Sequence, residues 1–393
     1  MSDHFSTTAV HAGETRRKPY SALTTPIVQT STYTFSDTGE ILDYMRSKQW
    51  GDLPERDEYG RYSNPTIRAA EDKLAALEGG ERSLLFSSGM GAITTTLLAL
   101  LSAGDHLILA SDSYHRTREF VCAYLDRWGI KSSLVPIDDS QAMEAALRPE
   151  TRLIFAETPT NPYLRVMDLA HLAELAHSRG LVTLVDSTFA TPLNLRPLEL
   201  GIDLVVHSAS KYLGGHNDLL AGAVTGSAGW ISFIQGARGV LGGVSNPNDA
   251  YLLLRGLKTL GLRIQRQNES GLLAAQYLED HPAIARVYYP GLESHPDHKV
   301  AARLMSGFGG VVSFEIDGDF DKTARFIDNL QLPYIGPTLG GVESIVQQPS
   351  ALYSLNPLDR QEAGLKDNLV RYAVGVENIS DILFDLGQAL SKL

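Results

Sequence analysis

The order of hydrophobic and polar positions changes along the chain at about residue 64. Up to that point no helical or strand period persists, because prolines, a Ser/Thr-rich stretch (TTPIVQTSTYTFSDT) and charged loops interrupt it. A segment of this kind cannot easily form a core of its own, and we expect it to lie against a larger body. Beyond residue 64 the apolar residues recur with regular periods, which predicts that the folded core lies there.

Short apolar runs alternate with helical patterns between residues 64 and 210. One helix is predicted to start at Asn64, which can cap it with Pro65 in the first turn, and to stop at Gly79. A second is predicted between the capping residue Asp168 and Gly180. Strand–helix–strand units in series predict an α/β fold with a mostly parallel sheet covered by helices. The apolar runs typical of buried strands are 83–86, 106–110, 153–157, 181–186 and 204–208.

The pattern changes again towards the C-terminus. Residues 249–278 carry a continuous helical pattern that leads away from the predicted sheet, and residues 311–316 alternate as a half-exposed strand does. We place a domain boundary inside that helical stretch, near residues 255–270. The predicted organisation is an N-terminal arm (1–64), a larger α/β domain (65–260) and a smaller α+β domain (261–393).

Composition and charge narrow the function classes. The 393 residues include 34 Lys and Arg against 46 Asp and Glu, a net charge of −12, and 43% are hydrophobic, as in a soluble globular protein. The acidic balance argues against a nucleic-acid or anionic-membrane surface. The N-terminus lacks the apolar stretch of a secretory signal, and no apolar run approaches the ~20 residues of a membrane span. These features predict a cytoplasmic enzyme.

Cysteine and histidine usage points away from metal and disulfide chemistry. Cys122 is the one cysteine of the sequence, which excludes an internal disulfide and a thiolate-rich zinc site. It lies in a helical pattern, and we predict a small core residue there. His207 and His216 have no second set of metal ligands at suitable spacing, so we expect both to be structural and predict no metal site.

Two charged residues stand at the ends of predicted strands, where ligands bind in parallel sheets. Lys211 follows strand 204–208 and is either solvated on a turn or a desolvated amine able to form a Schiff base. Asp186 ends strand 181–186 and either caps a turn or pairs with a buried cation such as a pyridinium nitrogen. Together the two residues favour pyridoxal phosphate as a cofactor.

That cofactor needs a binding site for its phosphate. The glycine turn after strand 83–86, at Gly89 and Met90, opens a helix whose free N–H groups and dipole favour an anion. Ser208 and Ser210 can add hydroxyl donors from the lysine strand.

The same turn resembles a dinucleotide fingerprint, which is the alternative. Gly89 and Gly91 are followed by Asp112 at about the expected 20 residues, but Thr94 occupies the third glycine position. The sequence therefore favours pyridoxal phosphate over NAD as the cofactor.

Two further residues could face a substrate or a ring. Tyr114 follows strand 106–110 and can either stack on a flat ring or pack in the core. Arg371, in NLVRYAVGVEN, can bind an α-carboxylate with its planar fork or form a surface ion pair.

The residues around Lys211 resemble a known family. Residues 203–217 (DLVVHSASKYLGGHN) are similar to the lysine signature of the pyridoxal-phosphate enzymes of cysteine and methionine metabolism, with Ser210 where threonine is usual. The resemblance extends over essentially the whole chain. It implies the type I fold of pyridoxal-phosphate-dependent transferases, similar to aspartate aminotransferase, and pyridoxal 5'-phosphate as the cofactor. Further blocks similar to the family are YGRYSNPT (59–66), SSGMGA (87–92), ETPTNP (157–162), VDSTFATP (185–192) and LGGVES (339–344).

The resemblance also implies a role for each matching residue. Lys211 would hold the cofactor as a Schiff base and shuttle protons, Asp186 would pair with the pyridine nitrogen, and Tyr114 would stack on the ring. The phosphate would be bound by Gly89, Met90, Ser208 and Ser210, and by Tyr59 and Arg61 of a neighbouring subunit in a homotetramer. The substrate would be bound by Arg371, Asn161 and Ser344 at its carboxylate, with Glu343 near the distal end.

Within the family, the blocks are most similar to plant-type members that catalyse γ-replacement. The activity implied is the transfer of L-cysteine onto an O-phospho-, O-succinyl- or O-acetylhomoserine, giving L-cystathionine for methionine biosynthesis. Arg116 and Arg118 can offer charge to a phosphate leaving group. The alternatives are a cystathionine γ-lyase, β-lyase or methionine γ-lyase activity on the same fold, an NAD(P)-dependent enzyme, and a non-catalytic binding protein.

Overall fold

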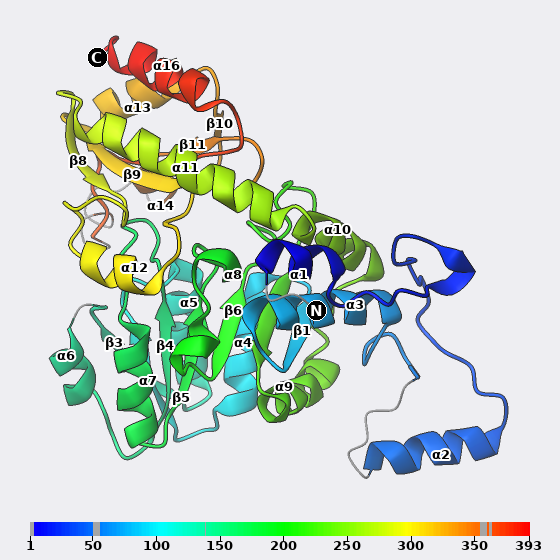
Figure 1. Ribbon diagram of the computed structural model, residues 1–393. Helices are drawn as coiled ribbons and strands as arrows, with labels where there is room; N and C mark the ends of the chain where they lie inside the picture. Colours follow the sequence, from blue (N-terminus) through cyan, green and yellow to red (C-terminus); the bar gives the residue numbers. More distant parts are fainter. Residues whose placement is uncertain (1–3, 50–55, 138, 354–359, 361–363) are drawn as a thin grey trace.

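Two bodies of secondary structure make up the chain in the computed structural model (Figure 1), which describes residues 4–49, 56–137, 139–353, 360 and 364–393. The larger body surrounds a seven-stranded sheet and the smaller one a five-stranded sheet. The long helix α11 (Leu260–Glu279) runs along the smaller body towards the larger one, and α2 (Thr38–Gln49) lies apart from both.

The seven-stranded sheet confirms the predicted α/β fold with a mostly parallel sheet. Only β7 runs against its neighbours, so the other six strands share one direction and end at the same edge. The strands in spatial order are β1 (Arg82–Phe86), β7 (Gly222–Gly226), β6 (Leu204–His207), β5 (Val182–Asp186), β4 (Thr151–Glu157), β2 (His106–Ala110) and β3 (Lys131–Val135).

All five predicted strands of the large domain are present, and the hydrophobic pattern missed two others. β3 lies at the edge of the sheet and is partly exposed, so its sequence KSSLV is half polar. β7 (GAVTG) is buried between β1 and β6, where small residues suit the close packing but give no apolar run. Edge position and glycine content thus hid these two strands.

Helices cover both faces of this sheet. One face packs against α4 (Gly89–Leu100), α9 (Ala228–Leu241) and the π-helical turn η2 (Phe120–Leu125). The other packs against α3 (Pro65–Glu78), α7 (Leu169–Ser178) and α10 (Pro247–Leu257). The shorter helices of this part of the chain are α1 (Phe5–His11), η1 (Pro19–Ser21), α5 (His115–Glu119), α6 (Ser140–Ala145), α8 (Thr191–Asn194) and η3 (Pro197–Leu200).

Both predicted helix boundaries are confirmed by their caps. The side chain of Asn64 accepts the backbone N–H groups of Thr66 and Ile67 at the start of α3, which ends at Gly79. The side chain of Asp168 accepts the N–H of His171 at the start of α7. Each cap satisfies N–H groups that have no partner within the helix.

The five-stranded sheet forms the core of the smaller body. Its strands in spatial order are β10 (Tyr334–Ile335), β11 (Ile345–Gln347), β12 (Leu369–Ala373), β9 (Val311–Ile316) and β8 (Ile284–Tyr288). The helices α11, α13 (Phe320–Asn329) and α16 (Ile379–Leu390) pack their apolar faces on it. Among the described residues, this part of the chain also carries two shorter helices, α12 (His298–Leu304) and α14 (Pro349–Tyr353).

Three sequence-based expectations are wrong. The strand at 311–316 is buried at all six positions rather than half exposed, since Ser313 on its second face donates a hydrogen bond to the carbonyl of Pro162 (2.7 Å) in the larger body. The helical pattern at 249–278 is two helices, α10 and α11, with a break at Lys258–Thr259. Cys122 is exposed, because η2 turns Val121 and Leu125 towards the core instead. Where the domain boundary falls stays a prediction.

The N-terminal segment is tied to the larger body by a buried cation. Lys73 of α3 is fully buried, and its Nζ donates to the carbonyls of Ala9 (2.8 Å) and Val10 (3.0 Å). The same Nζ forms an ion pair with Glu14 (3.3 Å). The side chain of Lys73 thus holds the last turn of α1, and Glu14 beyond it, against α3.

Neither a membrane span nor a metal cluster emerges from the part of the chain that the structure describes. None of its helices combines the length and the apolar composition needed to cross a membrane. Within this described part of the chain, no group of three His, Cys, Asp or Glu side chains lies close enough together to hold a metal ion.

Candidate active site

The segments that follow the parallel strands meet at one edge of the large sheet. The N–H of Tyr114, after β2, donates to Oε2 of Glu157 at the end of β4 (2.6 Å). The N–H of Thr158 donates to the carbonyl of Asp186 (3.1 Å), which ends β5. The N–H of Ser208, after β6, donates to Oγ1 of Thr188 (2.8 Å). These contacts bring the sequence-predicted residues of four separate strands together.

Lys211 lies in a tight turn directly after β6 and is partly buried. Its Nζ donates to Oγ1 of Thr338 (2.8 Å), which belongs to the loop between β10 and β11. Burial, reinforced by the charge of Arg371, lowers the pKa of Lys211 to about 8. Around pH 8 a substantial fraction of this amine is therefore uncharged and can act as a nucleophile or a base.

Arg371 on β12 faces the same place from the smaller body. Its side chain is buried, and burial lowers its pKa to about 10. Nη1 donates to Oδ1 of Asn161 (3.2 Å) and Nη2 to the carbonyl of Thr338 (2.9 Å). Among the described residues, its Nε has no hydrogen-bond partner. A buried guanidinium with an unused donor is suited to an anionic ligand such as a carboxylate.

Two buried carboxyl groups lie side by side at the strand ends. Glu157 and Asp186 are paired in register on β4 and β5, and both are less than 10% exposed. Burial, and then the charge of Asp186, raises the pKa of Glu157 well above its ordinary value. Burial also raises the pKa of Asp186, but two hydrogen bonds from Thr188 and the charge of His207 oppose that rise. Glu157 therefore holds a proton more readily, and Asp186 is the better anion.

Three of the predicted phosphate-binding residues, Gly89, Met90 and Ser208, lie together at the start of α4. The first N–H groups of a helix have no partner within it, and here they belong to Gly89 and Met90. A Cβ on Gly89 would lie 2.9 Å from Cβ of Ser208, so only glycine lets the turn approach the lysine strand this closely. The hydroxyl of Ser210 accepts the N–H of Ala221 (2.9 Å) and lies within hydrogen-bond distance of its carbonyl (3.2 Å).

Tyr114 is positioned by its own backbone. It precedes α5, its N–H is held by Glu157, and its half-buried ring packs edge-on against His115 with the ring centres 4.6 Å apart. Of the two arginines that follow, Arg116 pairs with Glu119 (2.6 Å), and Arg118 donates to the carbonyl of Ser111 (3.0 Å). Both guanidinium groups therefore already have partners within α5 and the loop before it.

Two predicted substrate residues make their contacts away from Arg371. The hydroxyl of Ser344 donates to Glu377 (2.9 Å) and accepts the N–H of Gly375 (2.9 Å). Glu343 is exposed and accepts a hydrogen bond from Nδ2 of Asn217 (3.0 Å). The structure thus joins Asn161, but not these two residues, to the Arg371 guanidinium; their roles stay predictions.

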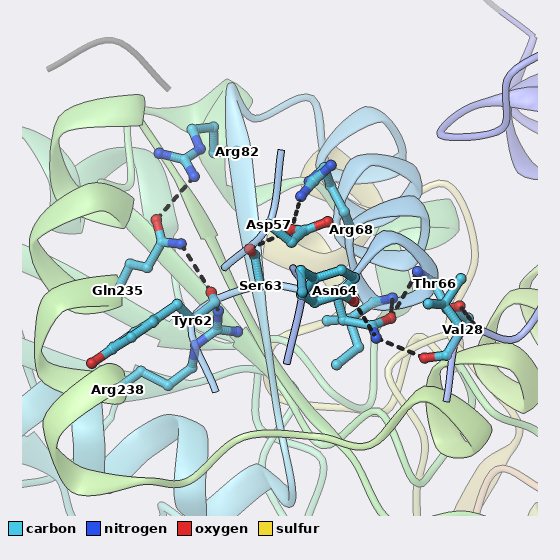
Figure 2. Close-up of polar contacts among 12 residues, drawn as sticks. Val28, Asp57, Tyr62, Ser63, Asn64, Thr66, Arg68, Arg82, Gln235 and Arg238 are labelled. Atoms are coloured by element: carbon cyan, nitrogen blue, oxygen red, sulfur yellow. Dashed lines mark hydrogen bonds and ion pairs between the residues drawn. The ribbon is translucent and has the colours of Figure 1, made fainter. Parts of the chain in front are cut away.

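Tyr59 and Arg61 lie on the arm, where Arg61 contacts α9 and the ring of Tyr59 lies near that of Tyr62. Arg61 donates to the carbonyl of Gly239 and lies over the ring of Tyr62 at 4.8 Å. Figure 2 shows how the neighbouring residues are held: Arg238 of α9 donates to the carbonyl of Tyr62 (3.3 Å), and Asp57 bonds with Ser63 and Arg68. Residues 57–63 of the arm are therefore held on their own subunit, with Tyr59 40% exposed.

Several contributing residues were not found by reasoning from the sequence. Thr338 contacts both Lys211 and Arg371, but it lies in a glycine-containing loop with no periodic pattern to mark it. Glu157 follows an apolar strand just as Asp186 does, and that position was the available signal. The Nε2 of His207 bonds with Glu78, and both side chains are buried; its structural role stays a prediction.

Comparisons with known proteins agree on one family. Residues 6–391 match the family described as Cys/Met metabolism PLP-dependent enzyme. The chain is 48% identical over 390 residues to the chloroplastic cystathionine γ-synthase 1 of Nicotiana tabacum, covering 98% of this chain and 71% of that protein. It is 40% identical to an L-methionine γ-lyase of Fusobacterium nucleatum subsp. polymorphum, covering 98% of both.

A solved structure is similar over the whole length. The crystal structure of metB from Corynebacterium glutamicum superposes with a TM-score of 0.92 and 34% sequence identity, and all of both chains is covered. The similarity includes both bodies and the strand-end edge that carries Lys211.

Proposed function

The chain belongs to the Cys/Met metabolism family of pyridoxal-phosphate-dependent enzymes, and we propose that it catalyses γ-replacement, joining an O-activated homoserine to L-cysteine. The products are L-cystathionine and the free acid of the ester, and the reaction belongs to methionine biosynthesis. In this step the Cγ–O bond breaks and a Cγ–S bond forms, while the thiol proton ends on the released acid. The observation that carries the proposal is the 48% identity to plant cystathionine γ-synthases over 98% of the chain.

The residues present fit pyridoxal 5'-phosphate. Asp186 is a buried carboxylate that suits a protonated ring nitrogen, and Lys211 has an amine of lowered pKa. The close approach of Gly89 to Ser208 leaves helix N–H groups and a hydroxyl together for a phosphate. When bound, the cofactor supplies an electron sink that stabilises negative charge next to the substrate nitrogen.

The chain's own residues then position the substrate and move its protons. Arg371, oriented by Asn161 and Thr338, has its Nε free for the substrate α-carboxylate. The Nζ of Lys211 would take a proton from Cα, give it up to the bound cofactor and, as a neutral amine again, take one from Cβ, since the γ-substituent leaves readily only once Cβ carries negative charge. After the cysteine thiolate adds at Cγ, the same Nζ returns the protons. Thr338 gives the free amine a partner between these steps.

The proposed activity predicts a strict need for a thiol. With an O-activated homoserine and cysteine, the purified holoenzyme should form cystathionine, and omitting cysteine should slow release of the acid at least roughly tenfold, because the thiolate completes the productive route. Cystathionine formation is measured by chromatography, and ketoacid release by a coupled assay. Rapid ketoacid release from cystathionine or methionine, without added thiol, would favour the lyase alternatives instead.

The ester is identified by the same assay. We propose O-phosphohomoserine first, because the plant enzymes are the most similar relatives described above, with O-succinyl- and O-acetylhomoserine as the alternatives. The value of kcat/KM is compared for the three esters in the wild type and in Arg116→Gln and Arg118→Gln. If these arginines bind the phosphate of the substrate, the substitutions should lower kcat/KM only with O-phosphohomoserine. Equal values of kcat/KM with all three esters would exclude that role.

The active site is proposed to be shared between subunits of a homotetramer. Tyr59 and Arg61 line an open hollow of about 560 Å³ on the arm, and Arg61 would exchange its hydrogen bond to the carbonyl of Gly239 for the cofactor phosphate of a neighbour. Large apolar side chains such as Leu23 and Val240 are at least 85% exposed, which suits burial against another subunit. A cytoplasmic location is proposed from the acidic, cysteine-poor composition.

Subunit sharing predicts complementation between two inactive variants. Lys211→Ala and Arg61→Ala subunits, mixed by unfolding and refolding together, should regain up to about a quarter of wild-type activity, because one of the two sites in each mixed dimer has both native residues. A mixture of Lys211→Ala with Arg371→Leu serves as the control, since both residues belong to the same chain, and it should regain nothing. Recovery no greater in the first mixture than in the control would refute the shared site.

A further inference from the structure

The turn that carries Lys211 is held by an arginine from another element. Within the turn, the N–H of Lys211 donates to the carbonyl of Ser208 (3.1 Å), and the N–H of Gly215 donates to the carbonyl of Lys211 (2.8 Å). The carbonyl of Tyr212, the next residue, accepts a hydrogen bond from Nη1 of Arg263 at 2.7 Å. This places a guanidinium group on the carbonyl of the residue that follows the reactive lysine.

Arg263 joins that turn to the break between α10 and α11. Its Nη2 donates to the carbonyl of Gly256 at the end of α10 (2.8 Å), and its Nε donates to Oγ1 of Thr259 (3.2 Å). The side chain is 5% exposed, and burial lowers its pKa to about 10. Among the described residues no carboxylate forms an ion pair with it, so its charge is compensated by carbonyl and hydroxyl oxygens.

The backbone on both sides is shaped to this contact. Gly215 has φ +76°, and a Cβ on it would lie only 2.1 Å from Nη1 of Arg263. A Cβ on Gly256 would lie 2.2 Å from the carbonyl oxygen of Gly214. The turn and α10 can therefore approach this closely only with glycine at both positions, and the guanidinium lies between them.

Burying a cation without a carboxylate partner is unfavourable, and an apolar side chain of similar volume would fill the space at lower cost. What arginine adds is geometry, because its three donor nitrogens lie in one rigid plane and reach three acceptors on two elements. We propose that Arg263 is a positioning residue for Lys211, which fixes the direction of its amine by holding the carbonyl of Tyr212. The inference rests on the proposed function, since it concerns the same lysine.

The test compares Arg263→Met and Arg263→Lys with the wild type. Two quantities are measured for each protein. The first is the thermal unfolding midpoint with and without pyridoxal phosphate. The second is the pH midpoint of cofactor fixation, the midpoint of the pH range over which cofactor added to the cofactor-free protein becomes covalently linked on borohydride reduction. We expect Arg263→Met to lose about tenfold or more in cofactor affinity, to shift the pH midpoint away from that of the wild type, and to lower kcat/KM by roughly 10- to 100-fold. Arg263→Lys, which keeps the charge and one donor group, should lie between.

Arg266→Met is the matched control. Arg266 is three residues further along α11 and also donates to a backbone carbonyl, that of Glu377 (3.0 Å), away from the Lys211 turn. The Arg266→Met variant should lower the unfolding midpoint equally with and without pyridoxal phosphate, and it should keep the wild-type pH midpoint of cofactor fixation. The same result with Arg263→Met, or with Arg263→Lys if Arg263→Met does not fold, would show that Arg263 is only structural and overturn the proposal. A wild type that fixes no cofactor would instead overturn the proposed function.

Discussion

Replacing Lys211 by alanine is expected to abolish turnover, lowering kcat by about 10⁴-fold or more. This lies at the upper end of what a positioned acid–base group contributes, because one amine serves for cofactor attachment and for each proton transfer. The Nζ has no ready substitute, since Thr338, its partner at 2.8 Å, cannot act as a base near neutral pH. The measurements are kcat with the best ester and cysteine, and the covalent retention of cofactor after borohydride reduction.

A surface lysine provides the comparison for this variant. Lys299 on α12 is exposed, and Lys299→Ala should keep both the wild-type rate and covalent retention of the cofactor. Lys211→Ala should still bind pyridoxal phosphate, but without the covalent link, because Asp186 and the start of α4 remain in place. Normal turnover in Lys211→Ala would remove this lysine from the reaction, whatever happens to the cofactor spectrum.

Reasoning from the sequence found the residues that strand order brings together. Lys211 and Asp186 were predicted because each ends an apolar strand, and in a parallel sheet such ends meet at one edge. Caps gave the bounds of α3 and α7 equally well, since Asn64 and Asp168 act on residues two or three positions away. Local rules of this kind can be applied to a sequence without knowledge of its fold.

Such local rules could not predict the contacts between the two bodies. Thr338 lies 127 residues from Lys211, and Arg263 lies 51 residues from the Tyr212 carbonyl that it holds. Neither has a periodic pattern or a capping position that marks its contact. The burial of β9 was missed for the same reason, because its second face is covered by the loop around Pro162 rather than by a neighbour in sequence. Packing between segments far apart in the chain decides all three.

The second large effect is expected at Asp186, with Glu157 beside it as the matched comparison. Asp186→Asn should lower kcat/KM by roughly 150- to 5,000-fold, because removing one partner of a buried charge pair costs about 3–5 kcal/mol. Glu157→Gln makes the same change on the next strand, in register, and should leave kcat/KM within about threefold, because burial and the charge of Asp186 raise the pKa of Glu157 and so favour its neutral form.

The unfolding free energy of Glu157→Gln tests whether Glu157 favours its neutral form. Unchanged activity alone could also mean that the site tolerates the substitution whatever the charge of Glu157. Since the pKa of Glu157 is raised on folding, its contribution to stability is fully present below its ordinary pKa of 4.5 and is lost as the pH rises towards the folded value. The glutamine side chain of the variant does not titrate. The variant should therefore gain stability relative to the wild type as the pH rises above about 4.5, measured by urea unfolding at several pH values. A variant that instead loses stability with rising pH, or loses activity as Asp186→Asn does, would mean that Glu157 is the anion and Asp186 its protonated neighbour.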